Sequence, residues 1–242
     1  MQNTNLKKTA TCLAIASLSL LMPALARAAN DTKEVERMQQ SGQVIKELTD
    51  SASGVPLDIL GKSKCVIVLP SVKKAAFVVG GSYGRGVMTC RSGPDFTGTW
   101  SAPSLMQSKG GSFGFQIGGQ STDFVILVMN DKGARALLNG KVKLGGDASI
   151  AAGPVGRTAE ASTNAVMTAE MLSYSRSQGV FAGLSLSGSS LGPDNEANAA
   201  LYGKNLTAED IIVKHEVTRP ESAKLLVDTL AAKVPQNVSE KQ

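Results

Sequence analysis

The stretch GGSFGFQIGGQSTDFVILVM, residues 110–129, contains the pattern that decides the fold. Short apolar runs alternate with glycine pairs in it, and the flanking segments GTWSAPS (98–104) and LGGDASIAAGPVGR (144–157) are also rich in glycine and small residues. A glycine has no Cβ, so it lets a strand bend sharply or approach another strand closely. The whole stretch from Thr97 to Arg157 therefore predicts closely packed β-strands joined by tight bends.

The ends of the chain, in contrast, have helical patterns. Apolar residues recur at helical spacing from Thr32 to Asp50, and Asp131 to Leu138 predicts a shorter helix within the strand region. Near the C-terminus, Gly203 should end a helix that begins at Pro193. Two further helix starts are the capping box Thr207-Ala208-Glu209-Asp210 and the first-turn proline Pro220, followed by the apolar residues Leu225, Leu226, Val227 and Leu230.

Between the helices the sequence predicts about eight to ten antiparallel strands. Cys65 to Leu69 should be a buried strand that Pro70 ends. The other expected strands lie at residues 75–80 and 84–90, in the central stretch 97–129, and at 141–152, 158–163, 165–177 and 180–187. Elements segregated in this way are typical of the α+β class, here a rolled or barrel-like, mainly antiparallel β-sheet with N-terminal and C-terminal helices packed on it.

The first 28 residues have the pattern of a secretory signal peptide. Lys7 and Lys8 precede an apolar run from Ala10 to Met22, and Ala26-Arg27-Ala28 forms a small-x-small cleavage site. A run of about 13 residues is shorter than the ~20 that a membrane-spanning helix needs. We therefore expect a signal peptide at 1–28, a single domain at 29–242, and a periplasmic location, peripheral on a membrane leaflet.

The net charge of +5 does not indicate a nucleic-acid-binding protein. Three of the 25 basic residues and none of the 20 acidic residues lie in the signal segment, so the remaining chain is nearly neutral. The most basic stretch, Gly61 to Gly93, contains only Phe77 and Tyr83 as aromatic residues, too few for a platform on which bases stack. We expect no nucleic-acid partner.

Catalytic and metal-binding patterns are weak. Residues 80–84 and 110–114 both match Gly-x-Ser-x-Gly, but strand patterns follow them, whereas a nucleophile elbow needs a following helix and a histidine base. The only histidine, His215, should be exposed on a helix without ligand partners. Asp123 and Asp147 should bind backbone groups at turns rather than form a carboxylate pair. We expect no enzyme activity, no metal and no cofactor.

Two cysteines, Cys65 and Cys90, remain after removal of the signal segment. In an oxidising compartment such a pair can form a disulfide that closes a loop of about 26 residues and stabilises the fold by ~3–4 kcal/mol. The alternative is a pair of small buried apolar residues on neighbouring strands. The sequence leaves both possibilities open.

Two features remain as candidates for binding. The helix from Thr32 to Asp50 has an apolar stripe, edged by Arg37 and Lys46, that could meet a membrane or cover the protein's own core. The stretch from Gly61 to Gly93 contains six bases and no acid, so it could contact phosphates or form a solvated basic face. The stripe consists of Val35, Met38, Gly42, Ile45 and Leu48, and the bases are Lys62, Lys64, Lys73, Lys74, Arg85 and Arg91.

Several motifs, in the expected order, are similar to those of the SYLF domain family, lipid-binding domains of bacterial secreted proteins and of eukaryotic actin-patch and membrane-trafficking proteins. They are Lys73-Lys74-Ala75-Ala76-Phe77, the segments 98–104, 118–130 and 144–157, and Leu201-Tyr202-Gly203. The resemblance extends from Val35 to Ala231. It implies non-enzymatic binding of anionic phospholipid headgroups, of the phosphoinositide type in that family, by an amphipathic N-terminal segment and basic residues.

The stripe, its basic edges and the basic stretch together form the set of candidate lipid-binding residues. The set is Val35, Arg37, Met38, Ile45, Lys46, Leu48, Lys62, Lys64, Lys73 and Lys74. The expected partner is an anionic lipid or membrane surface. The alternative is a periplasmic structural or protein-interaction module that binds no lipid and has an envelope protein as its partner.

Overall fold

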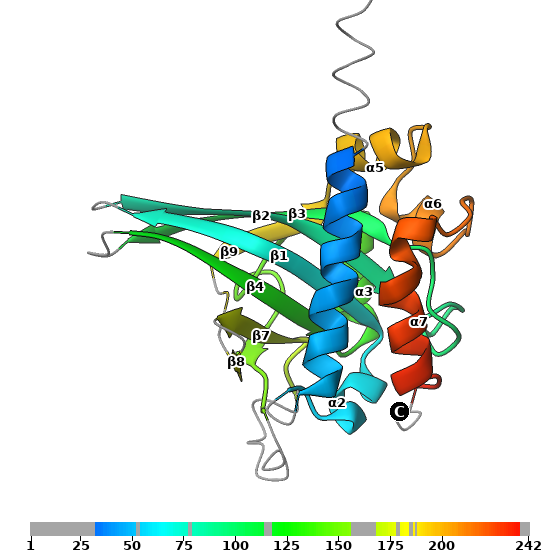
Figure 1. Cartoon of the computed structure of the whole chain (residues 1–242), viewed down its shortest axis with the longest axis horizontal. Coiled ribbons are helices and arrows are strands. Elements are labelled where there is room, and N and C mark those ends of the chain that lie inside the picture. The colour runs from blue at the N-terminus through cyan, green and yellow to red at the C-terminus, as the bar shows by residue number, and fades with distance from the viewer. Residues whose placement is uncertain are drawn as a thin grey trace, which may run out of the picture.

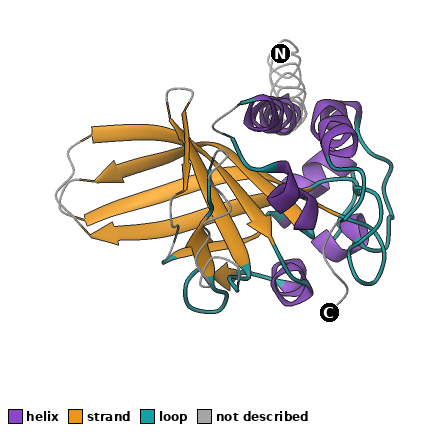
Figure 2. Cartoon of the chain, turned by 90° about the horizontal axis from the view of Figure 1, so that it is seen from below, coloured by secondary structure: helices purple, strands orange, loops and turns teal. Residues whose placement is uncertain are grey.

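The computed structural model describes residues 32–51, 54–76, 79–113, 118–155, 168–177, 180–183, 186 and 188–237. Within these residues, nine strands form one curled sheet, and helices gather at one end of it (Figures 1 and 2). Strand pairs are antiparallel except for β6 with β7, and the order is β5-β9-β3-β2-β1-β4-β7-β6, with β8 on β7. This architecture confirms the α+β class and the rolled, mainly antiparallel sheet.

The elements have the following bounds. The strands are β1 (Cys65–Ala76), β2 (Val79–Cys90), β3 (Ser104–Phe113), β4 (Gly118–Val128), β5 (Val142–Lys143), β6 (Ile150–Ala152), β7 (Met171–Ser177), β8 (Val180–Gly183) and β9 (Ser189–Pro193). The helices are the N-terminal helix (32–50), α2 (Leu57–Lys62), α3 (Asp131–Asn139), α5 (Asn195–Tyr202), α6 (Ala208–Ile212), the short 3-10 helix η2 (Glu221–Ala223) and α7 (Lys224–Lys233).

Strand β1 continues past Pro70, which we expected to end it. Proline has no N–H for the ladder, so inside a sheet it is confined to edges and irregular positions. Here the pairing of β1 with β4 shifts between Leu69 and Val72, and Ser71 takes a positive φ of 52°. The freed Ser71 N–H donates to the Asp123 carboxylate at 2.8 Å. The irregularity therefore accommodates the proline within one long strand.

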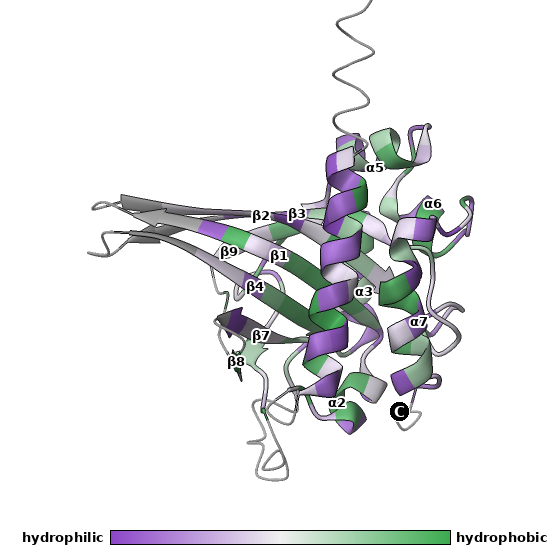
Figure 3. Ribbon diagram, in the orientation of Figure 1, coloured by the Kyte–Doolittle hydropathy of each residue, from purple (hydrophilic) through white to green (hydrophobic). Residues whose placement is uncertain are grey.

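Apolar side chains on the two faces of the sheet build two cores. One face, which includes Val66, Val68 and Leu127, packs against the N-terminal helix, α2 and α7. The other face, which includes Ile67 and Ile126, packs against α3 and α6. Figure 3 shows hydrophobic strand segments beneath the N-terminal helix. This helix-covered part of the sheet, the covered part, is buried on both faces.

Strands β1 to β4 extend well beyond the helices (Figures 1 and 2). The projecting part of the sheet is defined here as the four strand ends that lie beyond the helices. Its boundary with the covered part is marked by one residue on each strand: Lys73 on β1, Tyr83 on β2, Lys109 on β3 and Ser121 on β4. These four residues are aligned across the sheet by direct pairing. The projecting part is therefore a continuation of the same strands into solvent.

The C-terminal helix signals are confirmed. Gly203 ends α5 in the left-handed conformation at φ 72°, and Thr207 and Asp210 form the capping box of α6. Pro220 precedes η2 and α7, as expected. Three details were wrong. The helix α5 begins at Asn195 rather than at Pro193, which is the last residue of β9. Leu225 is 40% exposed and points away from the core, and His215 lies in a loop at φ 55° rather than in a helix.

The strand expected at 141–152 is interrupted. The Asp147 carboxylate accepts a hydrogen bond from the Lys143 N–H at 2.8 Å and closes a turn between β5 and β6, with Gly145 at φ 80°. Side-chain binding to the backbone competes with the ladder in this way. The strand expected at 158–163 and the signal segment at 1–28 lie outside the described residues.

Candidate functional site

The apolar stripe of the N-terminal helix lies against the sheet. Met38, Ile45 and Leu48 are completely buried in the core that also contains β1, β4 and α7, and Val35 is half-buried. At Gly42 the helix crosses α7 so closely that a Cβ would lie 2.9 Å from the Leu226 nitrogen. In this conformation the stripe covers the protein's own core. A direct role of these side chains in lipid binding stays a prediction and requires the helix to leave the sheet.

A buried charge network fixes the start of this helix. The Glu34 carboxylate is 4% exposed and pairs with Arg37 on its own helix and with Arg85 on β2 at 3.4 Å. Arg85 also lies 3.0 Å from the carboxylate of Asp194, the N-cap residue of α5. Removing one member would leave a buried charge without compensation. Arg37 and Arg85 are therefore engaged within the fold.

The far end of the helix is held by partly exposed ion pairs. Glu47 pairs with Arg176 on β7 at 2.5 Å, and Asp50 pairs with Lys233 of α7 at 2.8 Å and with Lys46 at 2.6 Å. The hydrogen bonds from Lys233 and Lys46 lower the pKa of Asp50 to about 2. Lys46 is thus also paired, although its side chain remains half exposed.

The basic stretch does not form one surface. The side chain of Lys64 is only 13% exposed, lies 3.4 Å from the Asp131 carboxylate and donates to the Asp95 carbonyl at 2.8 Å. Lys62 is half-buried at the end of α2 and also has a partner. Lys73 is exposed on β1, and no described acid pairs with it. The side chain of Lys74 lies outside the described set.

Arg91 belongs to the interior rather than to a basic face. Its guanidinium stacks 4.3 Å from the centre of the Trp100 ring and donates to the carbonyl oxygens of Ser63, Val234 and Gln236 at 3.0 to 3.3 Å. Burial lowers the pKa of Arg91 to about 10. The side chain ties the segment after α7 to the sheet, so its role is structural.

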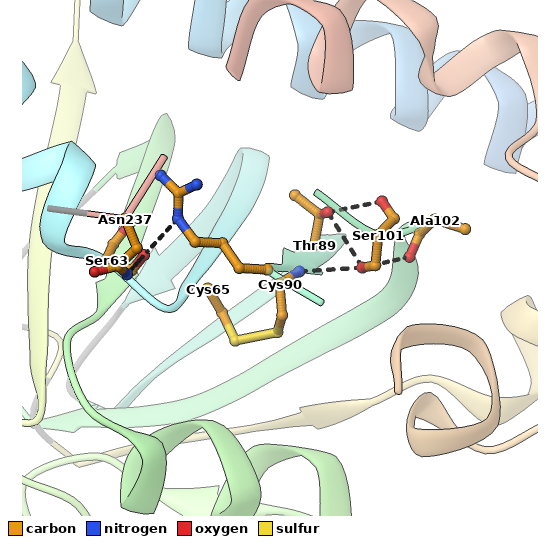
Figure 4. Close-up of a disulfide and its surroundings, with 8 residues drawn as sticks. Ser63, Cys65, Thr89, Cys90, Ser101, Ala102 and Asn237 are labelled. Carbon is orange, nitrogen blue, oxygen red and sulfur yellow. Dashed lines mark hydrogen bonds between the residues drawn. A yellow bond between two sulfur atoms is a disulfide. The ribbon is translucent and has the colours of Figure 1, made fainter. Parts of the chain in front are cut away.

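Cys65 and Cys90 face each other directly on β1 and β2 and are joined by a disulfide (Figure 4). Next to it, the Thr89 hydroxyl donates to the Ser101 carbonyl at 2.9 Å, and the Cys90 N–H donates to the Ser101 hydroxyl. Both cysteines are completely buried. The bridge lies at the covered end of the β1–β2 hairpin.

No catalytic arrangement emerges among the described side chains. Ser82 and Ser112 lie inside β2 and β3, so neither occupies a strand–turn–helix elbow. Asp123 and Asp147 bind backbone N–H groups, as expected. The residues that the structure describes contain no group of three or more potential metal ligands. None of their helices is both long and apolar enough to span a membrane.

The register of the sheet reveals a surface that sequence reasoning did not assemble. Lys73 pairs with Tyr83 across β1 and β2, and Tyr83 pairs with Lys109 across β2 and β3. All three side chains are exposed, and the Lys109 ammonium lies 6.0 Å from the centre of the Tyr83 ring. We call these three residues the lysine–tyrosine row. Only the strand pairing brings Lys109 to the other two, since it is 26 residues away from Tyr83 in sequence.

The chain is similar in sequence to several eukaryotic proteins. An SH3 domain-containing protein of Schizosaccharomyces pombe is 38% identical over 183 residues, which are 74% of this chain and 41% of that protein. LAS seventeen-binding protein 3 of Saccharomyces cerevisiae is 34% identical over 186 residues, 76% of this chain and 40% of that protein. SH3 domain-containing YSC84-like protein 1 of Bos taurus is 34% identical over 199 residues, 79% of this chain and 57% of that protein.

The chain thus spans about half the length of these relatives, or less. No solved structure matches it. The Ysc84 family, described as Las17-binding protein actin regulator, matches residues 109–233, which run from within β3 to the end of α7. The chain therefore belongs to the Ysc84 (SYLF) family.

Proposed function

We propose that this protein is a non-enzymatic module that binds anionic phospholipid headgroups at a membrane surface. The observation that carries the proposal is the charge on the part of the sheet that the helices leave uncovered. There Lys73 on β1 and Lys109 on β3 are exposed, and no described acid pairs with either. Each base close to an anionic leaflet adds ~1 kcal/mol of attraction, so a few are enough for salt-sensitive docking.

The proposal includes export. Residues 1–28 have the n-region, apolar run and cleavage site of a secretory signal, and Cys65 and Cys90 form a bridge suited to an oxidising compartment. The lipid would then belong to a leaflet that faces the periplasm. Fractionation of cells that express the full chain, with the size of the product measured by mass spectrometry, tests this part: an unprocessed cytosolic product would contradict it.

A protein-interaction module without lipid affinity is the second candidate. Two observations favour it: the completely buried stripe of Met38, Ile45 and Leu48, and the name of a relative, LAS seventeen-binding protein 3, which refers to a protein partner. On this alternative the N-terminal helix only closes the core, and the partner of the present chain would be an envelope protein.

Co-sedimentation of the purified protein with phosphatidylcholine vesicles, with or without phosphatidylglycerol, separates the two candidates. The lipid-binding function predicts pelleting only with phosphatidylglycerol and loss of pelleting at high salt, because surface charge attraction is screened within a Debye length of ~10 Å at 0.1 M salt. Pelleting with neither vesicle at low salt would leave the interaction module as the function.

A further inference from the structure

The lysine–tyrosine row has a defined geometry. Residues that pair directly across neighbouring antiparallel strands point to the same face of the sheet, so Lys73, Tyr83 and Lys109 share a face. Since neighbouring strands are ~4.8 Å apart, the two lysines start about 10 Å from each other, with the tyrosine ring between them. Their long side chains can converge on one group or contact two neighbouring groups.

The row lies on the face of the sheet that packs against the N-terminal helix, but beyond that helix. Arg85, two residues along β2 from Tyr83, reaches Glu34 of the N-terminal helix, which fixes the side of the sheet. On its other edge, Lys73 pairs with Ser121 of β4, which is also exposed. The row therefore lies at the base of the projecting part, immediately next to the helix.

The lysines of the row are not neutralised by described acids. The acid nearest along these strands is Asp123, whose carboxylate already accepts from Ser71 and lies 3.6 Å from Arg176. Two strands beyond Lys109 the pairing continues through Ser190 to a further exposed lysine, Lys143. No described acid therefore pairs with Lys73 or Lys109.

Tyr83 gives the row an amphipathic centre. Its side chain is 44% exposed, one of the few large apolar side chains in the described chain that remain so accessible. Tyrosine rings prefer the headgroup level of a bilayer, where the ring meets acyl chains and the hydroxyl meets water. One lysine on each side of such a ring matches the phosphates of neighbouring lipids.

We propose that Lys73, Tyr83 and Lys109 form the docking surface for an anionic phospholipid bilayer, with the lysines on lipid phosphates and the tyrosine ring at the interface. The inference rests on the proposed function and assigns that function to the sheet face instead of the N-terminal helix. Since each lysine contributes about fivefold to the affinity, loss of both should weaken binding about 30-fold.

The test compares two double variants that change the net charge equally. Lys73→Gln/Lys109→Gln removes the row, and Lys132→Gln/Lys204→Gln removes two exposed lysines at the helical end, one on α3 and one after α5. All four side chains are exposed, but Lys132 pairs with the Glu170 carboxylate at 2.6 Å, so the unfolding temperature of each variant is first compared with that of the parent. The readout is the affinity for phosphatidylcholine vesicles containing phosphatidylglycerol, with phosphatidylcholine alone as the blank.

The expected result is about 30-fold weaker binding of the row variant and little change for the control variant. Equal loss of affinity in both variants would mean that only the net charge of the protein matters. Unchanged binding of the row variant would mean that other residues contact the membrane. Either result overturns the assignment of the docking surface to the lysine–tyrosine row, while the proposed lipid-binding function stands. Failure of the parent protein to bind either vesicle overturns both. Inorganic phosphate that competes better than chloride at equal ionic strength would identify a free-anion site and overturn the membrane assignment.

Discussion

Strands β1 to β4 serve two different purposes along their length. In the covered part, consecutive residues from Cys65 to Leu69 are buried on both faces, between the N-terminal helix and α7 on one side and α3 and α6 on the other. In the projecting part, the same strands expose Lys73, Tyr83 and Lys109. Pairing of β2 with β3 is continuous through both parts, whereas the pairing of β1 with β2 shifts between Val68 and Lys73.

The two parts of the sheet are stabilised by different interactions. The covered part gains free energy from burial of apolar area, about 25 cal/mol per Å², whereas the projecting part relies on its hydrogen-bond ladder and cross-strand pairs. Because side chains of the projecting part bury little apolar area, replacing them should change the free energy of unfolding only slightly. Mutations should therefore affect stability in the covered part and binding in the projecting part.

The largest expected effect is the loss of Leu48 from the covered part. Leu48→Ala removes a completely buried side chain between the helix and the sheet, and we expect a decrease of ~4 kcal/mol in the free energy of unfolding, in the upper half of the range for such cavities. Chemical denaturation followed by circular dichroism measures it. The matched variant Tyr83→Ala, in the projecting part, should change the free energy by less than ~1 kcal/mol. Equal effects would show that the projecting part also belongs to the core.

A smaller effect is expected from the disulfide, which closes only the covered end of the β1–β2 hairpin. Cys65→Ala/Cys90→Ala releases a loop with a sequence separation of 25 residues, and the chain-entropy account gives a loss of ~3.5 kcal/mol. Amide hydrogen exchange should show faster opening at Val87 to Thr89 and a smaller change near Tyr83. Uniform acceleration along β2 would contradict the division into two parts.

Sequence periodicity was sufficient for the covered part. The N-terminal helix, the capping box at Thr207, the Gly203 cap and the buried strand at Cys65 to Leu69 all depend on local patterns of polarity or on turn residues. The α+β class followed from their order. The motifs that resemble the SYLF family also lie mainly in this part and in the loops attached to it.

Register, in contrast, could not be obtained from the sequence. Pro70 was read as a strand end because a proline removes one ladder donor, but Asp123, 53 residues later in the chain, compensates by accepting from Ser71. The same limit hid the lysine–tyrosine row, since Lys109 lies outside the basic stretch and meets Tyr83 only through pairing. Burial of Arg91 was equally invisible, because its partners include carbonyls beyond α7.

The smallest expected effect concerns α6, which supplies Ile211 and Ile212 to the covered part through a capping box. Thr207→Ala should cost ~1 kcal/mol at neutral pH. Hydrogen bonds from Lys214 and Thr207 hold the pKa of Asp210 well below its usual range. The contribution of its carboxylate to the free energy of unfolding is therefore complete above about pH 4, the ordinary pKa of aspartate, and is lost only as the pH falls through the lower folded pKa.

The difference in free energy of unfolding between Thr207→Ala and the parent should therefore become smaller in that acidic range. Thr49→Ala is the control, because the Thr49 hydroxyl binds only backbone carbonyls within its helix, so its difference from the parent should not follow the titration of Asp210. A Thr207 difference that stays constant down to strong acid would show that the capping box does not depend on the charge of Asp210.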